Sequence, residues 1–570
     1  MPRIWTCLPK LLLPGGLKPG HARLAQYEDE PGSGIDITAC FRFACVFALA
    51  ALCTQFTVAA QARLDGSVAN SCATLPAPAG VKFAETPAWV ESQALPTYCR
   101  VTGTIAGRTR FEMRLPQQWS GRFMMAGCGG FCGALIPDKP GHSNAINEAL
   151  KRGYAAISHD GGHQAESWET HWASDPEALE LWAHKILPVV AGTGTELATS
   201  LYGREPSYRY FSGCSNGGRL GLQAAQRYPE LFDGIAAGGS IFELSGIAGL
   251  WGNWLIHNNQ NGLDSRIPQA RVPLIQQVVM NTCDALDGQA DGIITDPRAC
   301  AVDFTTATCD AGAPAGDNCL SEPEAQLLNT LYGGVKNGQG EVIYPAVAFG
   351  SEHYVDRWLF GADGKPAWGV LASAGYRQML AMDLSEKDVP AGLPTDQMLD
   401  WISRSAVPAL TDAKNTDLSG LREAGNKLLI YQGWSDPLII PEPITHYYDK
   451  AADAAGGLQQ LQENARLFMV PGWGHCWEKP ADAPDRFDPL LELEQWVEGG
   501  RAPEYMLARQ IDAAGVETRS RPICSYPLVA QLEVGKDPDK YQNYSCINQD
   551  RTVRRSSGER YLSKRGNNND

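Results

Sequence analysis

Basic residues are too few in this 570-residue chain for a typical nucleic-acid-binding protein. Lysine and arginine number 48 against 64 aspartate and glutamate residues, which gives a formal net charge of −16. Proteins that bind nucleic acid need a basic face, so this balance argues against that class of partner. The acidic excess is most simply a soluble surface and does not by itself indicate cationic partners.

Long apolar runs and internal repeats are also missing from most of the chain. After residue 62 no span reaches the roughly 18 apolar residues of a membrane-crossing helix, so we expect no membrane contact in the mature form. Hydrophobic residues make up 44% and charged residues 20%, which is ordinary for a globular protein. A chain of 570 residues is too long for one simple core and favours two domains or one domain with a large insertion.

The cysteines lack the paired C-x-x-C spacing of a metal site and suit a disulfide framework instead. Of 16 cysteines, 12 follow residue 63, an even number. Other connectivities remain open, but a framework of this kind indicates an oxidising compartment. Proximity predicts the pairs Cys72–Cys99, Cys128–Cys132, Cys283–Cys300, Cys309–Cys319 and Cys524–Cys546, which leaves Cys214 and Cys476 for each other.

The N-terminal segment is consistent with secretion. Phe41 to Ala60 is mostly apolar and runs into Ala60-Gln61-Ala62, an A-x-A cleavage pattern. We therefore interpret residues 1–62 as a leader with a signal peptide, and expect a secreted or periplasmic protein. The apolar segment begins late, and a membrane anchor is the alternative interpretation.

The rest of the chain divides into four segments. Short apolar runs alternate with helical stretches over residues 63–240 and again over 421–550, which indicates an α/β sheet. Residues 241–420 are rich in loops and tryptophan and are interpreted as an insertion, and residues 551–570 as a disordered tail. Strands are expected at 122–126, 154–158, 208–212, 232–237, 427–432 and 466–470, and a helix at 217–228.

Ser215 is the predicted nucleophile. It lies in Gly213-Cys214-Ser215-Asn216-Gly217, a G-x-S-x-G pattern between a predicted strand and a predicted helix. That context presents a serine hydroxyl at a sharp turn, with glycines that let the backbone pack closely. The alternative is a glycine-rich turn with an idle serine.

His475 is the predicted base and Asp436 the predicted acid. Each lies just past a predicted strand, and both follow Ser215 in the order serine, acid, histidine. If Cys214 and Cys476 pair, their Cα atoms lie about 4.4–6.8 Å apart, and the neighbouring Ser215 and His475 then lie within roughly 14 Å. A packing histidine is the alternative for His475, and Asp482, Asp485 and Asp488 are weaker candidates for the acid.

A glycine loop supplies the predicted oxyanion hole. Two backbone N–H groups are needed there, one from Asn216 and one from the loop Gly127 to Gly133. Gly129 and Gly130 are the candidates, and the sequence does not choose between them. A plain glycine-rich turn is the alternative.

An acidic loop in the insertion predicts a calcium site. Asp284, Asp287 and Asp291 offer carboxylates, and Gln289 and Ile293 offer backbone carbonyls, which are the hard oxygen ligands that calcium prefers. Closure of the loop by Cys283 and Cys300 would make the site structural. A solvated acidic turn is the alternative.

Taken together, these motifs resemble the tannase and feruloyl esterase family of secreted α/β-hydrolases, which includes mono(2-hydroxyethyl) terephthalate hydrolases. The similarity covers about residues 70–550 and is carried by Gly213 to Gly218, Gly433 to Pro437, Gly474 to Cys476, the glycine loop and the acidic loop. Two departures are the extra cysteines Cys128 and Cys132, and Gln432, where the family often has histidine.

The resemblance implies an α/β-hydrolase fold with a large inserted lid domain over 241–420 that carries calcium and shapes the pocket. It also implies hydrolysis of small aromatic esters, namely ferulates, gallates or terephthalate half-esters, through an acyl-enzyme. Trp251, Trp254 and Trp358 are candidates for the pocket, and Arg404 for binding a free carboxylate. An inactive calcium-stabilised binding protein is the alternative from another class.

Overall fold

The computed structural model describes residues 71–548 except 140–144, 262–263, 312–313, 362–364, 477 and 479–482. The predicted leader over residues 1–62 and the predicted tail over 551–570 lie outside the described residues. None of the helices that are described is long and apolar enough to cross a lipid bilayer.

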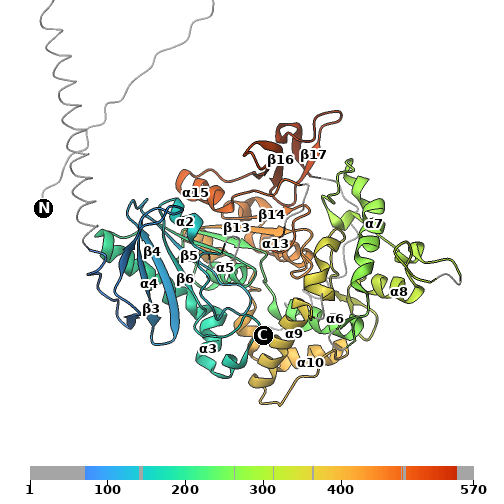
Figure 1. Ribbon diagram of the computed structural model, residues 1–570, viewed down its shortest axis with the longest axis horizontal. Coiled ribbons are helices and arrows are strands. Elements are labelled where there is room, and N and C mark those ends of the chain that lie inside the picture. Colours follow the sequence, from blue (N-terminus) through green and yellow to red (C-terminus); the bar gives the residue numbers. More distant parts are fainter. Residues whose placement is uncertain are drawn as a thin grey trace, which may run out of the picture. The chain divides into compact units, whose positions relative to one another are not determined.

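A mixed sheet forms the centre of the molecule (Figure 1). Its order is β1-β3-β4-β6-β5-β7-β8-β13-β14, with β2 paired to β3. Strands β6, β5, β7, β8, β13 and β14 pair parallel with one another along this order. Strands β1 to β4 pair antiparallel, and β4 also pairs antiparallel with β6. The strands are β1 (Val81–Phe83), β2 (Ala88–Val90), β3 (Tyr98–Ile105), β4 (Thr109–Pro116), β5 (Arg122–Ala126), β6 (Ala155–His159), β7 (Tyr208–Cys214), β8 (Gly234–Gly238), β13 (Lys427–Gly433) and β14 (Ala465–Val470).

The parallel strands are buried on both faces because successive side chains enter two different cores. Met124 belongs to one apolar cluster and Met125 to the other, and Ala236 and Ala237 divide in the same way. This explains why these strands appear in the sequence as continuous apolar runs. The predicted strands and the helix after Ser215 are all confirmed, with bounds that differ by one or two residues.

Helices from the sequence around these strands cover the sheet. Helix α5 packs on β7 and β8, α4 on β5 and β6, and α15 on β8 and β13. These helices are α2 (Asn147–Lys151), α3 (Pro176–Glu180), α4 (Ile186–Tyr202), α5 (Asn216–Arg227), α13 (Glu442–Ala455), α14 (Leu458–Gln462) and α15 (Pro489–Gly499), with the short helices η1 (His171–Ser174) and η2 (Leu181–Lys185).

The segment between β8 and β13 adds no strand to the central sheet among the described residues. In Figure 1 its helices α6 to α10, coloured green to orange, gather on one side of the molecule. The described residues form one compact unit, so the predicted domain boundaries stay predictions. The segment holds α6 (Gly252–Asn259), α7 (Val272–Cys283), α8 (Glu322–Leu331), α9 (Trp368–Asp383), α10 (Thr395–Arg404), α11 (Val407–Thr411), α12 (Ser419–Glu423), β9 (Gln260–Asn261), β10 (Asp264–Ser265), β11 (Val335–Lys336), β12 (Val342–Tyr344), η3 (Ser245–Trp251), η4 (Gln269–Arg271), η5 (Asp284–Asp287), η6 (Pro297–Ala299), η7 (Phe304–Ala307), η8 (Glu352–Tyr354) and η9 (Asp356–Phe360).

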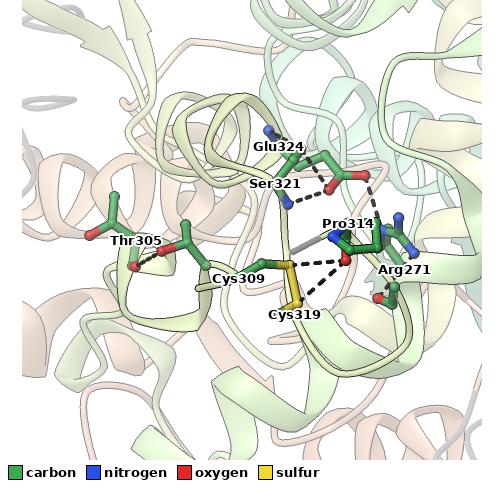
Figure 2. The surroundings of a disulfide bond; sticks show 9 residues. Arg271, Thr305, Cys309, Pro314, Cys319, Ser321 and Glu324 are labelled. Atoms are coloured by element: carbon green, nitrogen blue, oxygen red, sulfur yellow. Dashed lines mark hydrogen bonds and ion pairs between the residues drawn. A yellow bond between two sulfur atoms is a disulfide. The ribbon is translucent and has the colours of Figure 1, made fainter. Parts of the chain in front are cut away.

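Local bonds stabilise the start of α8 inside this segment (Figure 2). Ser321 and Glu324 form a capping box, in which each side chain accepts a hydrogen bond from the other residue's backbone N–H. Glu324 also binds Arg271 at 3.0 Å. The disulfide between Cys309 and Cys319 closes the loop that leads into this cap.

After α15 the chain forms two hairpins. Strands β15 (Tyr505–Ile511) and β16 (Glu517–Cys524) pair antiparallel, as do β17 (Val529–Leu532) and β18 (Tyr544–Ile547), with η10 (Tyr541–Asn543) before the last strand. The second hairpin is joined to the first by the Cys524–Cys546 disulfide.

All six predicted disulfides are present in the structure. The five local pairs are Cys72–Cys99, Cys128–Cys132, Cys283–Cys300, Cys309–Cys319 and Cys524–Cys546. Cys214 pairs with Cys476 across 262 residues of sequence, with a Cα–Cα distance of 5.9 Å. This last bridge joins the end of β7 to the loop that follows β14.

Candidate functional site

Ser215 occupies a strained turn between β7 and α5. Its φ of 62° and ψ of −125° lie in a region that residues other than glycine rarely adopt. A Cβ atom at Gly213 would lie 2.7 Å from the carbonyl of Gly217, so only glycine permits the turn to close this tightly. The strained serine at a strand-to-helix turn is the geometry that exposes a nucleophilic hydroxyl.

His475 and Asp436 contact each other at the ends of neighbouring strands. His475 Nδ1 lies 2.8 Å from Asp436 Oδ2, and both side chains are buried. The second carboxylate oxygen of Asp436 accepts hydrogen bonds from the backbone N–H groups of Leu438 and Ile439. The acid is therefore fixed by its own loop and can orient the imidazole.

The long-range disulfide brings Ser215 and His475 into one region. Each is the chain neighbour of a half-cystine in the Cys214–Cys476 bridge, so their Cα atoms lie within about 13.5 Å of each other. Gly239 fits beside the bridge, because a Cβ atom there would lie 3.0 Å from Cys214 Sγ and 3.5 Å from Ser215 N. The three residues predicted as nucleophile, base and acid therefore lie in the same region of the structure.

Asn216 connects the turn to the glycine loop. Its side chain donates from Nδ2 to the carbonyl oxygen of Cys128 at 3.1 Å and accepts a hydrogen bond from Arg219 Nε at 2.7 Å. Gly127 also lies against the turn, since a Cβ atom there would come within 2.7 Å of Gly217 Cα. The loop predicted to complete an oxyanion hole is thus held directly against the residue after Ser215.

Arg219 is a fully buried cation that supports this contact. Its other guanidinium N–H groups donate to the carbonyl oxygens of Ala183, Trp182 and Thr411 at 2.7, 3.0 and 3.2 Å. Burial lowers the pKa of Arg219 to about 9. Its guanidinium also lies 4.4 Å from the centre of the Trp182 ring, so α5 is fixed to η2 and α11.

An apolar cavity adjoins Ser215 and Asn216. Among the described residues that line it, none is charged. Gly130 contributes to its wall, whereas Gly129 does not, which favours Gly130 of the two oxyanion candidates. The remaining lining is Phe131, Trp168, Trp182, Ile241, Leu244, Ile247, Ala248, Trp251, Gly252, Leu255, Leu359, Gly369, Ala372, Pro437, Leu438 and Ile439.

The four residues of the insertion that were predicted to shape the pocket occupy different places in the structure. Trp251 lines the cavity, and Trp254 stacks behind it with ring centres 5.2 Å apart. Trp358 packs against His475 instead, with ring centres 4.9 Å apart. Arg404 is wrong as a carboxylate-binding residue of this cavity, because its side chain is 45% exposed and pairs with Asp400 one helical turn away.

The two histidines after β6 are buried outside the cavity lining. His159 is fully buried, and His163 stacks on Trp172 with ring centres 3.7 Å apart. Burial lowers the pKa of each to about 4, so both are neutral at physiological pH. Neither is among the described residues that line the cavity beside Ser215.

The carboxylates of the acidic loop accept hydrogen bonds from backbone N–H groups of the same loop. Asp284 accepts from the backbone N–H of Gly292 at 3.0 Å, and Asp287 from that of Gln289 at 2.9 Å. Asp291 accepts from the N–H of Ile293 at 3.2 Å. Partial burial raises the pKa of Asp287, although the N–H of Gln289 and the hydroxyl of Thr295 donate hydrogen bonds to its carboxylate.

The donor set of this loop fits calcium in type and charge, since carboxylate and carbonyl oxygens are the ligands that calcium prefers. The carboxylates are nevertheless not gathered around one point: within the described residues, no three acidic, histidine or cysteine side chains are grouped to hold a metal ion. Arg521 of β16 pairs with Asp291. One of the three acids therefore already has a cationic partner.

Three residues of the site carried no recognisable motif. Gln432 donates to Asp436, Arg219 binds Asn216, and Glu478 binds the backbone N–H of His475. Gln432 was noted only as a departure from the family pattern. Glu478 and Arg219 had no signal beyond lying three and four residues after the predicted base and nucleophile.

Comparisons with known proteins agree with this arrangement. The chain matches the model of the family described as "Tannase and feruloyl esterase" over residues 92–547. It is 30% identical to mono(2-hydroxyethyl) terephthalate hydrolase of Piscinibacter sakaiensis over 526 residues, which covers 81% of this chain and 86% of that protein. It is 28% identical to feruloyl esterase B of Aspergillus niger, with 80% of this chain and 88% of that protein covered.

Among solved structures, the chain is similar to feruloyl esterase B from Aspergillus oryzae. The TM-score is 0.73 at 22% identity, and the match covers 85% of this chain and all of that one. At this level of identity the likeness shows the fold, which is that of the α/β-hydrolases.

Proposed function

Since this chain belongs to the tannase and feruloyl esterase family and is a carboxylic ester hydrolase, we propose that it cleaves esters of aromatic acids with Ser215, His475 and Asp436 as its catalytic residues. The observation that carries the proposal is the strained Ser215, which directly follows Cys214 of the long-range disulfide. The other half of that disulfide, Cys476, directly follows His475, the residue that contacts Asp436.

The reaction proceeds in two steps. Ser215 Oγ attacks the ester carbonyl while His475 accepts its proton, and Asp436 stabilises the resulting imidazolium. The proton then passes to the departing alcohol, which leaves an acyl-enzyme. Water, deprotonated by His475, attacks the acyl carbonyl, and the aromatic acid is released as Ser215 regains its proton.

Backbone N–H groups stabilise the negative charge that develops on the carbonyl oxygen. The N–H of Asn216 is one donor, and a glycine of the 127–133 loop is the other, with Gly130 preferred over Gly129 because it lines the cavity. Arg219 supports this arrangement through Asn216, whose side chain binds the carbonyl of Cys128 in the same loop.

The cavity favours an uncharged aromatic acyl group. Its described lining is aromatic and aliphatic, with tryptophan and phenylalanine rings that suit a planar acid. A terephthalate half-ester carries a free carboxylate that needs a cation, and gallate carries three hydroxyl groups that need hydrogen-bonding partners. Ferulate-like esters are therefore the proposed substrates, with gallate esters and terephthalate half-esters as the alternatives.

The test is hydrolysis of methyl ferulate, methyl gallate and mono(2-hydroxyethyl) terephthalate by the purified protein, with the Ser215→Ala variant as the control. We expect turnover of methyl ferulate in preference to the other two, and loss of at least about 10³-fold in kcat with the variant. Full turnover by Ser215→Ala would overturn the mechanism. Inactivity of the folded protein on every ester would favour the inactive binding protein instead.

We also propose a structural calcium ion in the acidic loop, held by the carboxylates of Asp284, Asp287 and Asp291 and the carbonyl oxygens of Gln289 and Ile293. The donor type supports it, since carboxylate and carbonyl oxygens are the ligands that calcium prefers. The ion would stabilise the loop between Cys283 and Cys300 and takes no part in ester cleavage, since a serine triad needs no metal.

Finally, we propose that the protein acts in the periplasm or outside the cell. Six disulfides among the described residues support an oxidising compartment, as does the cleavage pattern predicted at Ala60 to Ala62.

A further inference from the structure

Glu478 belongs to the same tight turn as His475. The backbone N–H of His475 donates to Glu478 Oε2 at 3.1 Å, and the N–H of Glu478 donates back to the His475 carbonyl at 3.1 Å. The N–H of Gly474 donates to the Glu478 carbonyl at 2.9 Å. The carboxylate is thus fixed relative to the backbone from which the imidazole projects.

The same carboxylate binds two consecutive residues of the inserted segment. Trp358 Nε1 donates to Glu478 Oε2 at 2.8 Å, and Arg357 donates to Oε1 at 3.1 Å. Both come from η9, about 120 residues earlier in the chain. Glu478 therefore bonds the insertion to the loop of the proposed base, as does Tyr354, whose hydroxyl donates to the Gly472 carbonyl at 3.1 Å.

Trp358 transmits this contact to the imidazole itself. It is 1% exposed, and its ring meets the His475 ring edge to face, with centres 4.9 Å apart and planes at 78°. Edge-to-face contacts of this kind restrict ring orientation. The imidazole of His475 is then held from two sides, by Asp436 at Nδ1 and by Trp358 against its ring.

A row of aromatic rings continues from Trp358 to the glycine loop. Trp358 meets Trp368 at 4.9 Å, Trp368 meets Trp168 at 5.8 Å, and Trp168 meets Phe131 at 5.8 Å between ring centres. Trp168 and Phe131 line the cavity beside Ser215. The row therefore joins the base to the loop proposed to bind the oxyanion, and Glu478 fixes its end.

Opposing effects act on the charge of Glu478, and burial is the largest of them. Burial raises the pKa of Glu478, and the hydrogen bonds from Trp358 and from the N–H of His475 act in the opposite direction. The charged groups that face it are Arg357, His475 and Asp436. An ionised Glu478 adds a second negative charge near the imidazolium that forms during catalysis.

We propose that Glu478 is a positioning residue of the esterase, which orients the His475 imidazole through Trp358 and stabilises its cationic form. The inference rests on the proposed catalytic role of His475. Neither Glu478 nor Trp358 lines the cavity in the part of the chain that is described, so their removal affects the chemical step more than substrate binding.

The experiment compares wild type, Glu478→Gln, Trp358→Phe and the double variant on the best ester of the panel. Glutamine keeps the size of the side chain and removes its charge, and phenylalanine keeps a ring and removes the N–H donor. The matched control is Glu324→Gln, the same change in a carboxylate that also binds an arginine of the insertion, Arg271, at 3.0 Å. Melting temperature is recorded for each variant.

For Glu478→Gln we expect kcat to fall about tenfold with KM changed less than about twofold, because positioning is lost while the cavity is intact. The acid limb of kcat/KM should move to lower pH, since the imidazolium loses a neighbouring negative charge. The double variant should lose little more than either single variant, because both changes break the same contact. Glu324→Gln should keep the wild-type kcat and pH profile.

The inference would be overturned if Glu478→Gln and Trp358→Phe kept the kcat and the pH profile of the wild type, whether or not their melting temperatures fell. Glu478 would then be a merely structural residue. Inactivity of the wild type itself would overturn the proposed function first. The two failures are thus distinguished by the wild-type rate.

Discussion

Gln432 donates from Nε2 to Asp436 Oδ2 at 3.1 Å, the same carboxylate oxygen that lies 2.8 Å from His475 Nδ1. Gln432 also donates to the carbonyl of Ile439 at 3.2 Å and is fully buried. Gln432 is not among the described residues that line the cavity and contacts the acid instead. It shares the oxygen that orients the base, so this departure from the family pattern reaches the proposed triad directly.

Replacement of Gln432 by leucine should lower kcat/KM by about tenfold, because Asp436 loses one donor to its charged carboxylate. Gln432→His keeps an N–H donor and should recover most of the rate. The control is Gln226→Leu, which removes a partly buried amide that binds Ala413 and Tyr447 away from the acid. Equal rates for Gln432→Leu and wild type would show that Asp436 is held adequately by its own loop.

Removal of the Cys214–Cys476 bridge by a double change to alanine should lower both stability and turnover. The expected loss is about 2–4 kcal/mol in the free energy of unfolding, together with a fall in kcat because Ser215 and His475 lose their covalent link. The paired control is Cys72→Ala with Cys99→Ala, which opens a loop of 27 residues at β3. That variant should lose stability and keep kcat; a similar fall in kcat in both would contradict a specific role for the first bridge.

Glu352 should make the folded protein less stable as pH rises. It is 1% exposed and accepts hydrogen bonds from Tyr332 and the N–H of Gly350. Burial raises the pKa of Glu352 to about 7 in the folded state, against about 4.3 in an unfolded chain. Between these values the folded state binds more protons, so the free energy of unfolding should fall by up to about 4 kcal/mol and level off above pH 7.

Urea unfolding of wild type and Glu352→Gln from pH 4.5 to pH 8 measures this contribution. The variant cannot ionise at this position, so the difference in unfolding free energy between the two proteins should change with pH in the direction given above. A difference that stays constant across the range would mean that Glu352 titrates at its ordinary pKa.

Chelation of calcium should lower the melting temperature without changing the ester preference. Calcium at about 100 times its Kd would stabilise the folded state by about 2.7 kcal/mol. Asp287→Asn should abolish the response to added calcium, whereas Asp303→Asn, an acid of the same segment that caps η7, should retain it. A melting temperature that excess chelator leaves unchanged would contradict the calcium proposal. Arg521 would then be the cationic partner of the loop, through Asp291.

Local patterns were sufficient to predict the sheet, the strained serine and the disulfides. A strand, a tight turn and a helix are specified by neighbouring residues, and Ser215 sits in such a run. Five disulfides close short loops, so spacing predicts them, and Cys214 and Cys476 follow by elimination.

The insertion was where sequence reasoning failed. Trp254 and Arg404 were chosen by residue type, yet neither lines the cavity, whereas Leu244, Ile247 and Leu359 do. Apolar residues of a helix are equally suited to the core and to a pocket wall, so type alone cannot separate them.

The sequence by itself thus determined the fold class, the candidate triad and the bridge that joins its halves, because each depends on a short motif or on cysteine pairing. Only the tertiary structure decided which residues support the triad. Arg219 binds carbonyls of η2 and α11, and Glu478 binds η9, and these contacts join segments that are distant in the chain. Such contacts arise from packing of whole elements, and no local pattern records them.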